Sequence, residues 1–273
     1  MTPRPARLVL LGHPVAHSLS PRIQNAALHS AGIDCHYDAL DVEPSAFETT
    51  IELLRAERAA GNVTVPHKER MFAACEAMSP LARHVGAVNT FWFDEDGRLT
   101  GDNTDVGGFA ASVHRLLGQT PHDISIGVLG AGGAAAAVLA AIEMWPGCDA
   151  HVYNRTPERA QLLCERFGSI ARAVDDVGVI AGAQLVVNAT SIGLHDDSLP
   201  IDLSLVSPDA VVADLVYRPG ETAFVREARR RGHRAVDGLG MLVEQAALAF
   251  ERWFGVNPDR SLMATVAGET RTR

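Results

Sequence analysis

Apolar runs alternate with amphipathic stretches along the first half of the chain, and turn residues separate them. The pattern predicts strands at 7–11, 35–40 and 62–65, a helix at 44–60 and a hairpin at 89–101 around Asp96-Gly97. Ser20-Pro21 opens a further helix, because Ser is a favoured N-cap and Pro is tolerated in the first turn. This half therefore predicts an α/β arrangement.

The second half alternates more regularly. It predicts strands at 124–130, 150–154, 184–190 and 210–217, an Ala-rich helix after the first of these, and helices at 156–167, 222–231 and 240–254. The strands are runs of Val, Ile and Leu, as expected for strands that are buried on both faces. The pattern indicates a doubly wound parallel sheet of the Rossmann type.

The length of 273 residues suits two domains. We expect one domain to contain residues 1–105 and 239–273, and the other to contain residues 106–238. The first boundary falls in a helix that starts near Val106, so we expect helices to connect the two domains.

Composition excludes several classes of protein. The net charge of −9 argues against a nucleic-acid surface, and the basic run Arg229-Arg230-Arg231 is explained by its place at the end of a helix. No apolar run approaches the ~20 residues of a membrane span, and the N-terminal apolar stretch is too short for a signal peptide. The four cysteines lack metal-like spacing and indicate a reducing compartment, so we expect a cytoplasmic protein.

Residues 128–138 (VLGAGGAAAAV) carry a dinucleotide fingerprint between a predicted strand and a predicted helix. Gly130 permits the tight turn, Gly132 lets the backbone approach a pyrophosphate, and Ala135 allows close packing of helix on sheet. The alternative is a glycine-rich turn in a protein that keeps the fold without the ligand. The context favours a bound dinucleotide.

The end of the next strand selects the cofactor. An NAD site places an acid there, whereas this chain has Asn154-Arg155-Thr156 and then Arg159. A guanidinium binds a 2′-phosphate, and cations at a helix start otherwise oppose the helix dipole. The segment therefore favours NADP.

Polar clusters follow the apolar elements of the first half. They are HSLSP at 17–21, NVTVPHK at 62–68, GAVNT at 86–90 and GDNTD at 101–105. With GAGGA, NRTxxRA, NAT and DGLGMLVEQAA in the second half, this ordered set resembles the shikimate dehydrogenase family from about residue 8 to residue 260. The resemblance implies an N-terminal α/β substrate domain, a Rossmann-type NADP domain and reduction of 3-dehydroshikimate to shikimate in chorismate and aromatic amino acid biosynthesis.

The resemblance also implies residue roles. Lys68 and Asp105 match the catalytic pair. Ser18 and Ser20 match the residues that bind the substrate carboxylate, and the other matching substrate contacts are Thr64, Asn89, Tyr217 and Gln245. The implied cofactor contacts are Gly130, Ala131, Gly132, Gly133, Ala134, Asn154, Arg155, Thr156, Arg159, Thr190, Leu215, Gly238 and Met241.

The chemistry of ketone reduction agrees with the catalytic pair. A lysine can stabilise a developing alkoxide and act as general acid, while a neighbouring aspartate holds its ammonium. Which of the two passes the proton stays open at this stage. The chain departs from the family pattern at two positions. Gln24 stands where His is common and keeps the hydrogen-bonding capacity, so we expect little change. Val106 stands where Gly is common; we expect it to alter local backbone freedom and to leave the Asp105 carboxylate in place.

No bound metal is expected, because His13, His17 and His67 lack metal-ligand spacing; we interpret His17 and His67 as structural. Two alternatives to shikimate reduction stay open. One is a paralogue acting on quinate or aminoshikimate, and the other is a metabolite sensor without turnover. Expected partners are limited to the small-molecule substrate, and the expected oligomeric state is a monomer or homodimer.

Overall fold

The computed structural model describes residues 5–268 of the chain, which divide into two compact units. The first unit contains the residues up to Gly108 and those from Leu242 onward, and the second contains Phe109–Met241. The division falls inside two helices, α5 (Asp105–Leu117) and α10 (Leu239–Phe254). No helix among residues 5–268 is long and apolar enough to cross a membrane.

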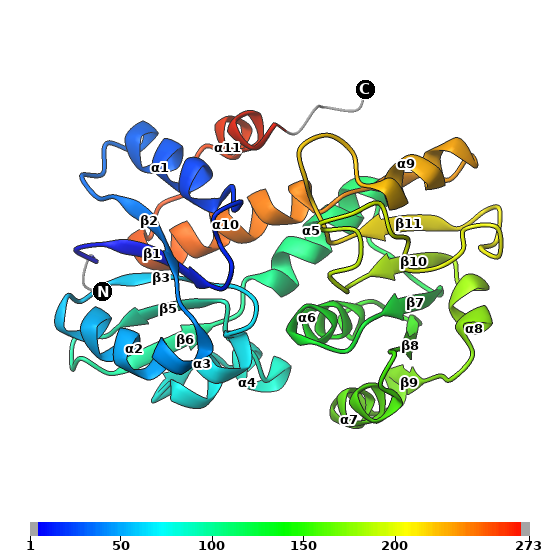
Figure 1. Ribbon diagram of the computed structural model, residues 1–273, viewed down its shortest axis with the longest axis horizontal. Coiled ribbons are helices and arrows are strands. Elements are labelled where there is room, and N and C mark those ends of the chain that lie inside the picture. The colour runs from blue at the N-terminus through cyan, green and yellow to red at the C-terminus, as the bar shows by residue number, and fades with distance from the viewer. Residues whose placement is uncertain (1–4, 269–273) are drawn as a thin grey trace. The chain divides into compact units, whose positions relative to one another are not determined.

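A mixed six-stranded sheet forms the centre of the first unit (Figure 1). Its strands, in spatial order, are β2 (Tyr37–Asp41), β1 (Leu8–Gly12), β3 (Ala60–Val63), β5 (Thr90–Phe93), β6 (Leu99–Asp102) and β4 (Ala77–Met78). Strands β2, β1 and β3 run parallel, β5 is antiparallel to both β3 and β6, and β4 is parallel to β6. The carboxyl ends of β1, β3 and β6 and the amino end of β5 therefore share one edge.

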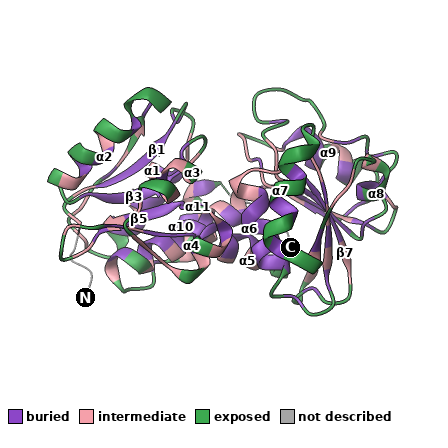
Figure 2. Ribbon diagram, turned by 90° about the horizontal axis from the view of Figure 1, so that it is seen from below, coloured by how far each residue is buried: buried purple, intermediate pink, exposed green. Residues whose placement is uncertain are grey.

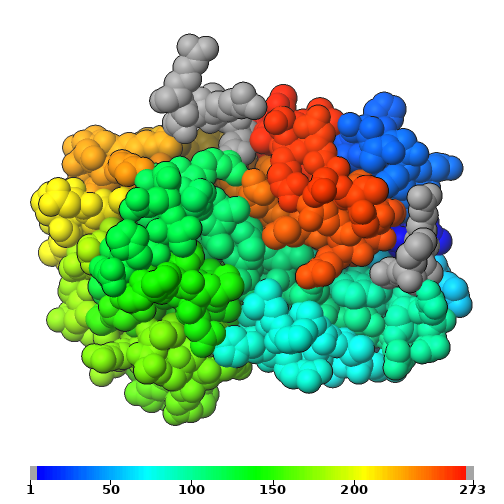
Figure 3. Space-filling view, turned by 180° about the vertical axis from the view of Figure 1, so that it is seen from behind, coloured from blue at the N-terminus to red at the C-terminus, as the bar shows by residue number. Residues whose placement is uncertain are grey.

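Helices accompany this sheet in the first unit. They are α1 (Ser20–Ser30), α2 (Phe47–Ala56), α3 (Lys68–Ala74), α4 (Pro80–Val85) and α11 (Arg260–Ala267). Helices α1 and α11 pack together although they lie at opposite ends of the sequence; in Figure 3 red atoms of the C-terminal segment meet blue atoms of the N-terminal one. A core cluster that includes Phe47, Ile51 and Phe91 fills the space between α2 and the strands.

The second unit contains a six-stranded, wholly parallel sheet. Its strands, in spatial order, are β12 (Ala235–Val236), β11 (Val211–Asp214), β10 (Leu185–Asn188), β7 (Ser125–Leu129), β8 (Asp149–Tyr153) and β9 (Ala171–Ala173). Its helices are α6 (Gly133–Ile142), α7 (Pro157–Phe167), α8 (Val177–Ala181) and α9 (Ala223–Arg230). This strand order is that of a Rossmann fold, with its topological switch point between β7 and β10.

Burial follows the strand composition. The central strands β1, β3, β7 and β10 are largely buried, while exposed residues lie on covering helices such as α2 and α9 (Figure 2). Helix α6 is buried along most of its length, as its run of alanines allows. Its residue Ala135 is fully buried, in accord with the predicted packing of helix on sheet.

Most predicted elements are present, with shifted ends. The helix predicted at 44–60 begins as a 3-10 turn (Pro44–Ala46) and ends with α2 at Ala56, since Arg58 takes a left-handed conformation (φ 50°) before β3. The short elements β4, α4, β9, α8, β12 and α11 were not predicted. The unit boundaries lie three residues beyond each predicted domain boundary.

Candidate active site

One edge of the first sheet gathers the polar segments that the sequence singled out. Strand β1 ends at Gly12 before the serine segment, β3 ends at Val63 before Thr64, β5 begins at Thr90 just after Asn89, and β6 ends at Asp102. Backbone bonds link these ends directly, because Val63 N–H donates to Asn89 O (2.8 Å) and Asn89 N–H donates to Asp102 O (3.1 Å). The sheet topology therefore explains why these segments meet.

Lys68 and Asp105 form an ion pair at this edge. Lys68 is the first residue of α3 and Asp105 the first of α5, and Lys68 Nζ lies 2.5 Å from Asp105 Oδ2. The side chains are 17% and 6% exposed, so a largely buried carboxylate faces a lysine that retains some contact with solvent. Asn89 Nδ2 donates to the other oxygen, Asp105 Oδ1, at 2.7 Å. The carboxylate is thereby held from both sides.

Lys68 also stands out in the composition. Among the 24 lysine and arginine residues it is the only lysine, a fact that the sequence analysis above did not use. An arginine stays protonated in a protein, whereas a lysine can lose and regain its proton. The chain thus places its one lysine beside a buried carboxylate.

The serine pair lies between β1 and α1. The prediction that Ser20 is an N-cap is wrong: α1 already includes Ser20, its N-cap is Leu19, and no side chain caps it. Instead the hydroxyl of Ser18 accepts a hydrogen bond from Ser20 N–H (3.2 Å). The helix therefore begins one residue earlier than predicted, and Pro21 still lies in its first turn, where its fixed φ is tolerated.

Thr64 approaches the serine segment from β3. A Cβ added to Gly12 would lie 2.3 Å from the Thr64 methyl group and 2.5 Å from Val15, so both side chains pack against the end of β1. Ser18 N–H in turn donates to Val15 O (3.0 Å). These contacts bring Thr64 and the serine segment to the same strand ends.

Helix α10 contributes Gln245. Its Oε1 lies 3.4 Å from Asn89 Nδ2, and its Nε2 donates to Leu242 O (2.8 Å). Gln24, the departure from the family pattern, is fully buried and donates through Nε2 to Ala246 O (2.9 Å), while its Oε1 has no hydrogen-bond partner within the described part of the chain. Gln24 thus contacts the helix next to Gln245.

The histidines take up different contacts. His67 is fully buried, its Nε2 lies 2.6 Å from Val42 O, and its ring packs against Phe47. His13 Nδ1 lies 2.6 Å from Asp41 Oδ1 near the surface. Residues 5–268 contain no group of three metal-ligating side chains.

In the second unit, the glycine-rich turn follows β7. Gly130 has φ +111°, and a Cβ there would lie 2.8 Å from Ala189 O at the end of β10, so the turn requires glycine. Gly132 is the N-cap of α6 and offers no capping side chain, and a Cβ on it would meet nothing within 4 Å. The side of Gly132 where a side chain would stand is therefore open, which leaves room for a pyrophosphate at the start of α6.

The segment after β8 presents two arginines. Arg155 and Arg159 are exposed, and their guanidinium groups have no hydrogen-bond or ion-pair partner among residues 5–268. Asn154 Nδ2 donates to Thr156 O (2.9 Å), which shapes the turn into α7. Two unpaired cations beside a helix start suit a phosphate monoester.

A buried polar network that the sequence analysis missed lies at the ends of β10 and β11. Asn188 accepts from Thr190 Oγ1 (2.7 Å) and donates to Asp214 Oδ1 (2.8 Å), and Asp214 also accepts from Thr222 Oγ1 (2.7 Å) and Val216 N–H (3.0 Å). Burial raises the pKa of Asp214 to about 6. The sequence does carry a signal for this network, because each of the two apolar strands ends in a polar residue.

Four further residues with predicted ligand contacts follow β11 in the chain: Leu215, Tyr217, Gly238 and Met241. Gly238 N–H donates to Val216 O (3.0 Å), and a Cβ there would lie 2.3 Å from Leu215 O. Tyr217 is half-buried three residues after β11, and Met241 is buried in the first turn of α10. Their contacts with ligands stay predictions.

A Rossmann unit with an open helix start, joined to a unit that carries a buried lysine–carboxylate pair, defines the class of dinucleotide-dependent dehydrogenases. Family models agree in detail. Residues 10–91 match the shikimate dehydrogenase substrate binding domain, and residues 238–267 match the shikimate 5'-dehydrogenase C-terminal domain. The chain belongs to the shikimate dehydrogenase family.

Individual relatives support this assignment. A shikimate dehydrogenase (NADP(+)) from Mesorhizobium japonicum is 44% identical over 90% of each chain. The structure of shikimate 5-dehydrogenase from Thermus thermophilus, in complex with NADP(H) and shikimate, matches with a TM-score of 0.87 and 42% identity over 96% of this chain and 98% of that one. A quinate dehydrogenase from Corynebacterium glutamicum, in complex with NAD, matches with a TM-score of 0.86 at 28% identity over 97% of this chain and 99% of that one.

These findings confirm the predicted family, the two-part α/β fold with its Rossmann-type sheet, and an NADP-dependent oxidoreductase as the class of enzyme. The lower identity to the quinate enzyme favours shikimate over the quinate alternative.

Proposed function

We propose that this chain catalyses the reversible NADPH-dependent reduction of 3-dehydroshikimate to shikimate, a step of chorismate and aromatic amino acid biosynthesis. The observation that carries the proposal is the 2.5 Å ion pair between Lys68 and Asp105 in a member of this family. A sensor without turnover needs no such pair.

Lys68 supplies positive charge and a proton where the ketone oxygen becomes an alcohol oxygen. An ammonium in a water-poor site stabilises a developing alkoxide more strongly than it does in bulk water. Asp105 holds that ammonium in place, and Asn89 fixes the carboxylate through its other oxygen. The lysine is thus oriented before substrate binds.

Ser18 and Ser20 bind the substrate carboxylate, and Thr64, Asn89, Gln245 and Tyr217 bind its ring hydroxyls. Hydroxyl and amide groups can both donate and accept, which suits a polyol. The support for this assignment is the shared strand edge that gathers the residues of the first unit.

NADPH supplies the hydride when it is bound. The first turn of α6 receives the pyrophosphate with Gly130, Ala131, Gly132, Gly133 and Ala134. Arg155 and Arg159 pair with the 2′-phosphate, beside Asn154 and Thr156. Thr190, Leu215, Gly238 and Met241 would supply the remaining contacts with the cofactor. Support comes from the open helix start and the two unpaired guanidinium groups.

The enzyme works in the cytoplasm as a monomer or homodimer. Support for a reducing compartment comes from Cys35, Cys75, Cys148 and Cys164, which are all free thiols. Sedimentation of the purified protein distinguishes the two assembly states.

The test is the absorbance of NADPH formed when purified protein meets shikimate and NADP. We expect robust turnover with this pair, much slower turnover with NAD, and little with quinate. Faster turnover of quinate would replace the proposed substrate, and no turnover of any of these would favour the sensor.

A further inference from the structure

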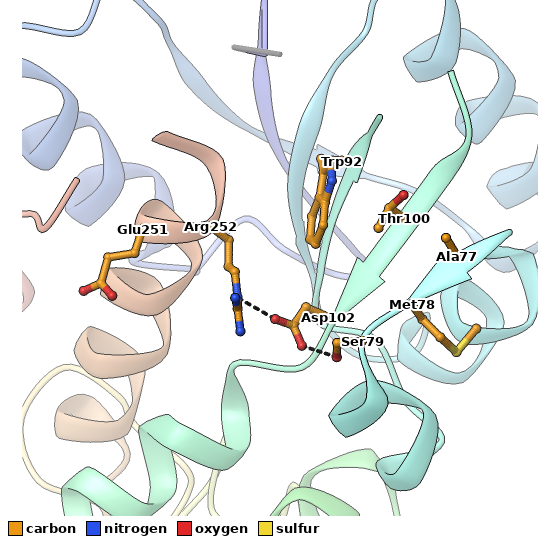
Figure 4. Close-up of a pocket in the computed structure, with 8 residues that line it drawn as sticks. All are labelled: Ala77, Met78, Ser79, Trp92, Thr100, Asp102, Glu251 and Arg252. Atoms are coloured by element: carbon orange, nitrogen blue, oxygen red, sulfur yellow. Dashed lines mark hydrogen bonds and ion pairs between the residues drawn. The ribbon is translucent and has the colours of Figure 1, made fainter. Parts of the chain in front are cut away.

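Asp102, at the end of β6, is a nearly buried carboxylate that none of the predicted roles uses. Its side chain is only 3% exposed. Oδ1 accepts hydrogen bonds from the Ser79 hydroxyl and from Asn103 N–H (2.8 Å), and Oδ2 faces Arg252 Nε at 2.6 Å. Figure 4 shows Arg252 on α10 reaching across to Asp102, with Ser79 on the other side of the carboxylate.

The turn that follows Asp102 carries the catalytic carboxylate. Asn103 Oδ1 accepts from Asp105 N–H (3.1 Å), and Asn103 Nδ2 donates to Ala87 O (2.9 Å). Thr104 N–H donates to Asn89 Oδ1 (2.7 Å). Fixing Asp102 therefore fixes the start of a turn whose last residue is Asp105.

Helix α10 contacts this turn at Asp102 and contacts Asn89, which is bonded to the turn at Thr104 and Asp105. Gln245 lies beside Asn89, and Arg252 pairs with Asp102. Seven residues separate Gln245 from Arg252, which is about two helical turns, so both project from one face. Helix α10 is also held by Gln24 Nε2, which donates to Ala246 O (2.9 Å), and by Trp253 Nε1, which donates to Phe91 O (3.3 Å), so Gln245 and Arg252 project from a helix that is itself held in place.

We infer that Asp102 and Arg252 form a positioning pair that holds Asp105 and Gln245 in their relative places for catalysis. The inference rests on the proposed function. Asp102 holds the start of the turn through its hydrogen bonds with Ser79 and Asn103. Its ion pair with Arg252 links the turn to α10. Removing the cation leaves a buried carboxylate with one oxygen facing no charge, so the turn and the helix shift to relieve it.

The test compares Arg252→Met, Arg252→Lys, Asp102→Asn and the Arg252→Met/Asp102→Asn double variant. Asp102→Asn keeps one oxygen to accept from Ser79 and Asn103, and it replaces the oxygen that faces Arg252 with an uncharged amide nitrogen, which cannot accept from the guanidinium. Because small displacements of reacting groups are costly, we expect Arg252→Met to lower kcat/KM for shikimate roughly 10- to 100-fold. We expect the affinity for NADP to stay unchanged, since the predicted cofactor residues lie in the second unit.

Two further outcomes separate positioning from general stability. The double variant is expected to lose no more than the more impaired single variant, because both changes break one interaction. Arg252→Lys is expected to recover part of kcat/KM by restoring the charge. The matched control is Arg55→Met, which removes the pairing of Arg55 with Glu76 (3.1 Å); Glu76 accepts from Leu99 N–H at the opposite end of β6. That variant is expected to lower Tm and leave kcat/KM unchanged.

If Arg252→Met lowers Tm but keeps wild-type kcat/KM, as the control does, the positioning role is wrong. Fully additive losses in the double variant would overturn it too. Should Asp102→Asn fail to fold, the Arg252 variants alone decide. A wild-type protein without shikimate turnover would instead refute the proposed function.

Discussion

Lys68 Nζ and Asp105 Oδ2 lie 2.5 Å apart although 37 positions separate the two residues in the chain. Each is the first residue of a helix that leaves the same edge of the first sheet. The pair therefore depends on the strand order, because β3, β5 and β6 must lie side by side for α3 and α5 to start next to each other.

The first prediction concerns the turn after β7. Gly132→Ala should leave Tm nearly unchanged, because a Cβ there meets no atom within 4 Å and the backbone is extended. The same methyl group would occupy space that the pyrophosphate needs, so we expect the Kd for NADP to rise roughly 10-fold or more. Calorimetric titration and thermal unfolding measure the two effects. An unchanged Kd would place the pyrophosphate elsewhere.

The second prediction concerns cofactor choice. Arg155→Asp should weaken NADP binding roughly 100-fold through the lost charge-assisted contact and the new repulsion, and should change NAD binding much less. Arg172→Asp, an exposed arginine on β9, makes the same change of charge as a control. Dissociation constants for both cofactors decide; equal losses for NADP and NAD would remove Arg155 from the phosphate site.

The third prediction concerns pH and Asp214. Burial raises the pKa of its carboxyl group from 3.8 to about 6 in the folded protein, so the folded state binds this proton more tightly than the unfolded state. The stabilisation from that proton is full below pH 3.8 and is lost as the pH rises through about 6.

Asp214→Asn removes this titration and can still bond Asn188, Val216 and Thr222. The free energy of unfolding of the variant, relative to wild type, should therefore increase between pH 4 and pH 7, by up to about 3 kcal/mol. Denaturant unfolding across this range provides the measurement. If the free energies of unfolding of the two proteins change in parallel with pH, the pKa of Asp214 is not raised.

Much of this architecture could be predicted from the sequence. The strand runs at 124–130 and 184–190 are long and apolar, and Gly130 and Gly132 mark the turn, so local pattern sufficed for the Rossmann sheet. The hairpin around Gly97 was equally clear. Short elements such as β4, with two residues, and β12 carry too little periodicity to be recognised.

The contacts that support the site were harder to predict than its catalytic residues. Lys68, Asn89 and Asp105 were found through ordered motifs, but the partnership of Asp102 with Arg252 joins positions 150 residues apart and has no local signal. The N-cap assigned to Ser20 was wrong because the helix already includes Ser20 and its N-cap is Leu19, while the Ser18 hydroxyl accepts from Ser20 N–H. Pairings of this kind depend on tertiary packing.

The fourth prediction concerns the lysine itself. Lys68→Arg makes the chain free of lysine and keeps a positive charge, yet guanidinium cannot pass its proton readily, so we expect little rescue of turnover. Lys68→Cys followed by alkylation with 2-bromoethylamine restores an amine at this position and should recover activity. The native thiols interfere little, since burial raises the pKa of Cys75 to about 12 and that of Cys164 to about 11, and raises those of Cys35 and Cys148.

The most direct measurement is kcat for shikimate oxidation by Lys68→Ala, with the Kd for NADP determined separately. Because the ammonium acts where charge develops in the transition state, kcat should fall roughly 100- to 1000-fold or more, while the Kd for NADP stays at the wild-type value. Near-normal turnover by Lys68→Ala would contradict the account and remove Lys68 from the chemistry.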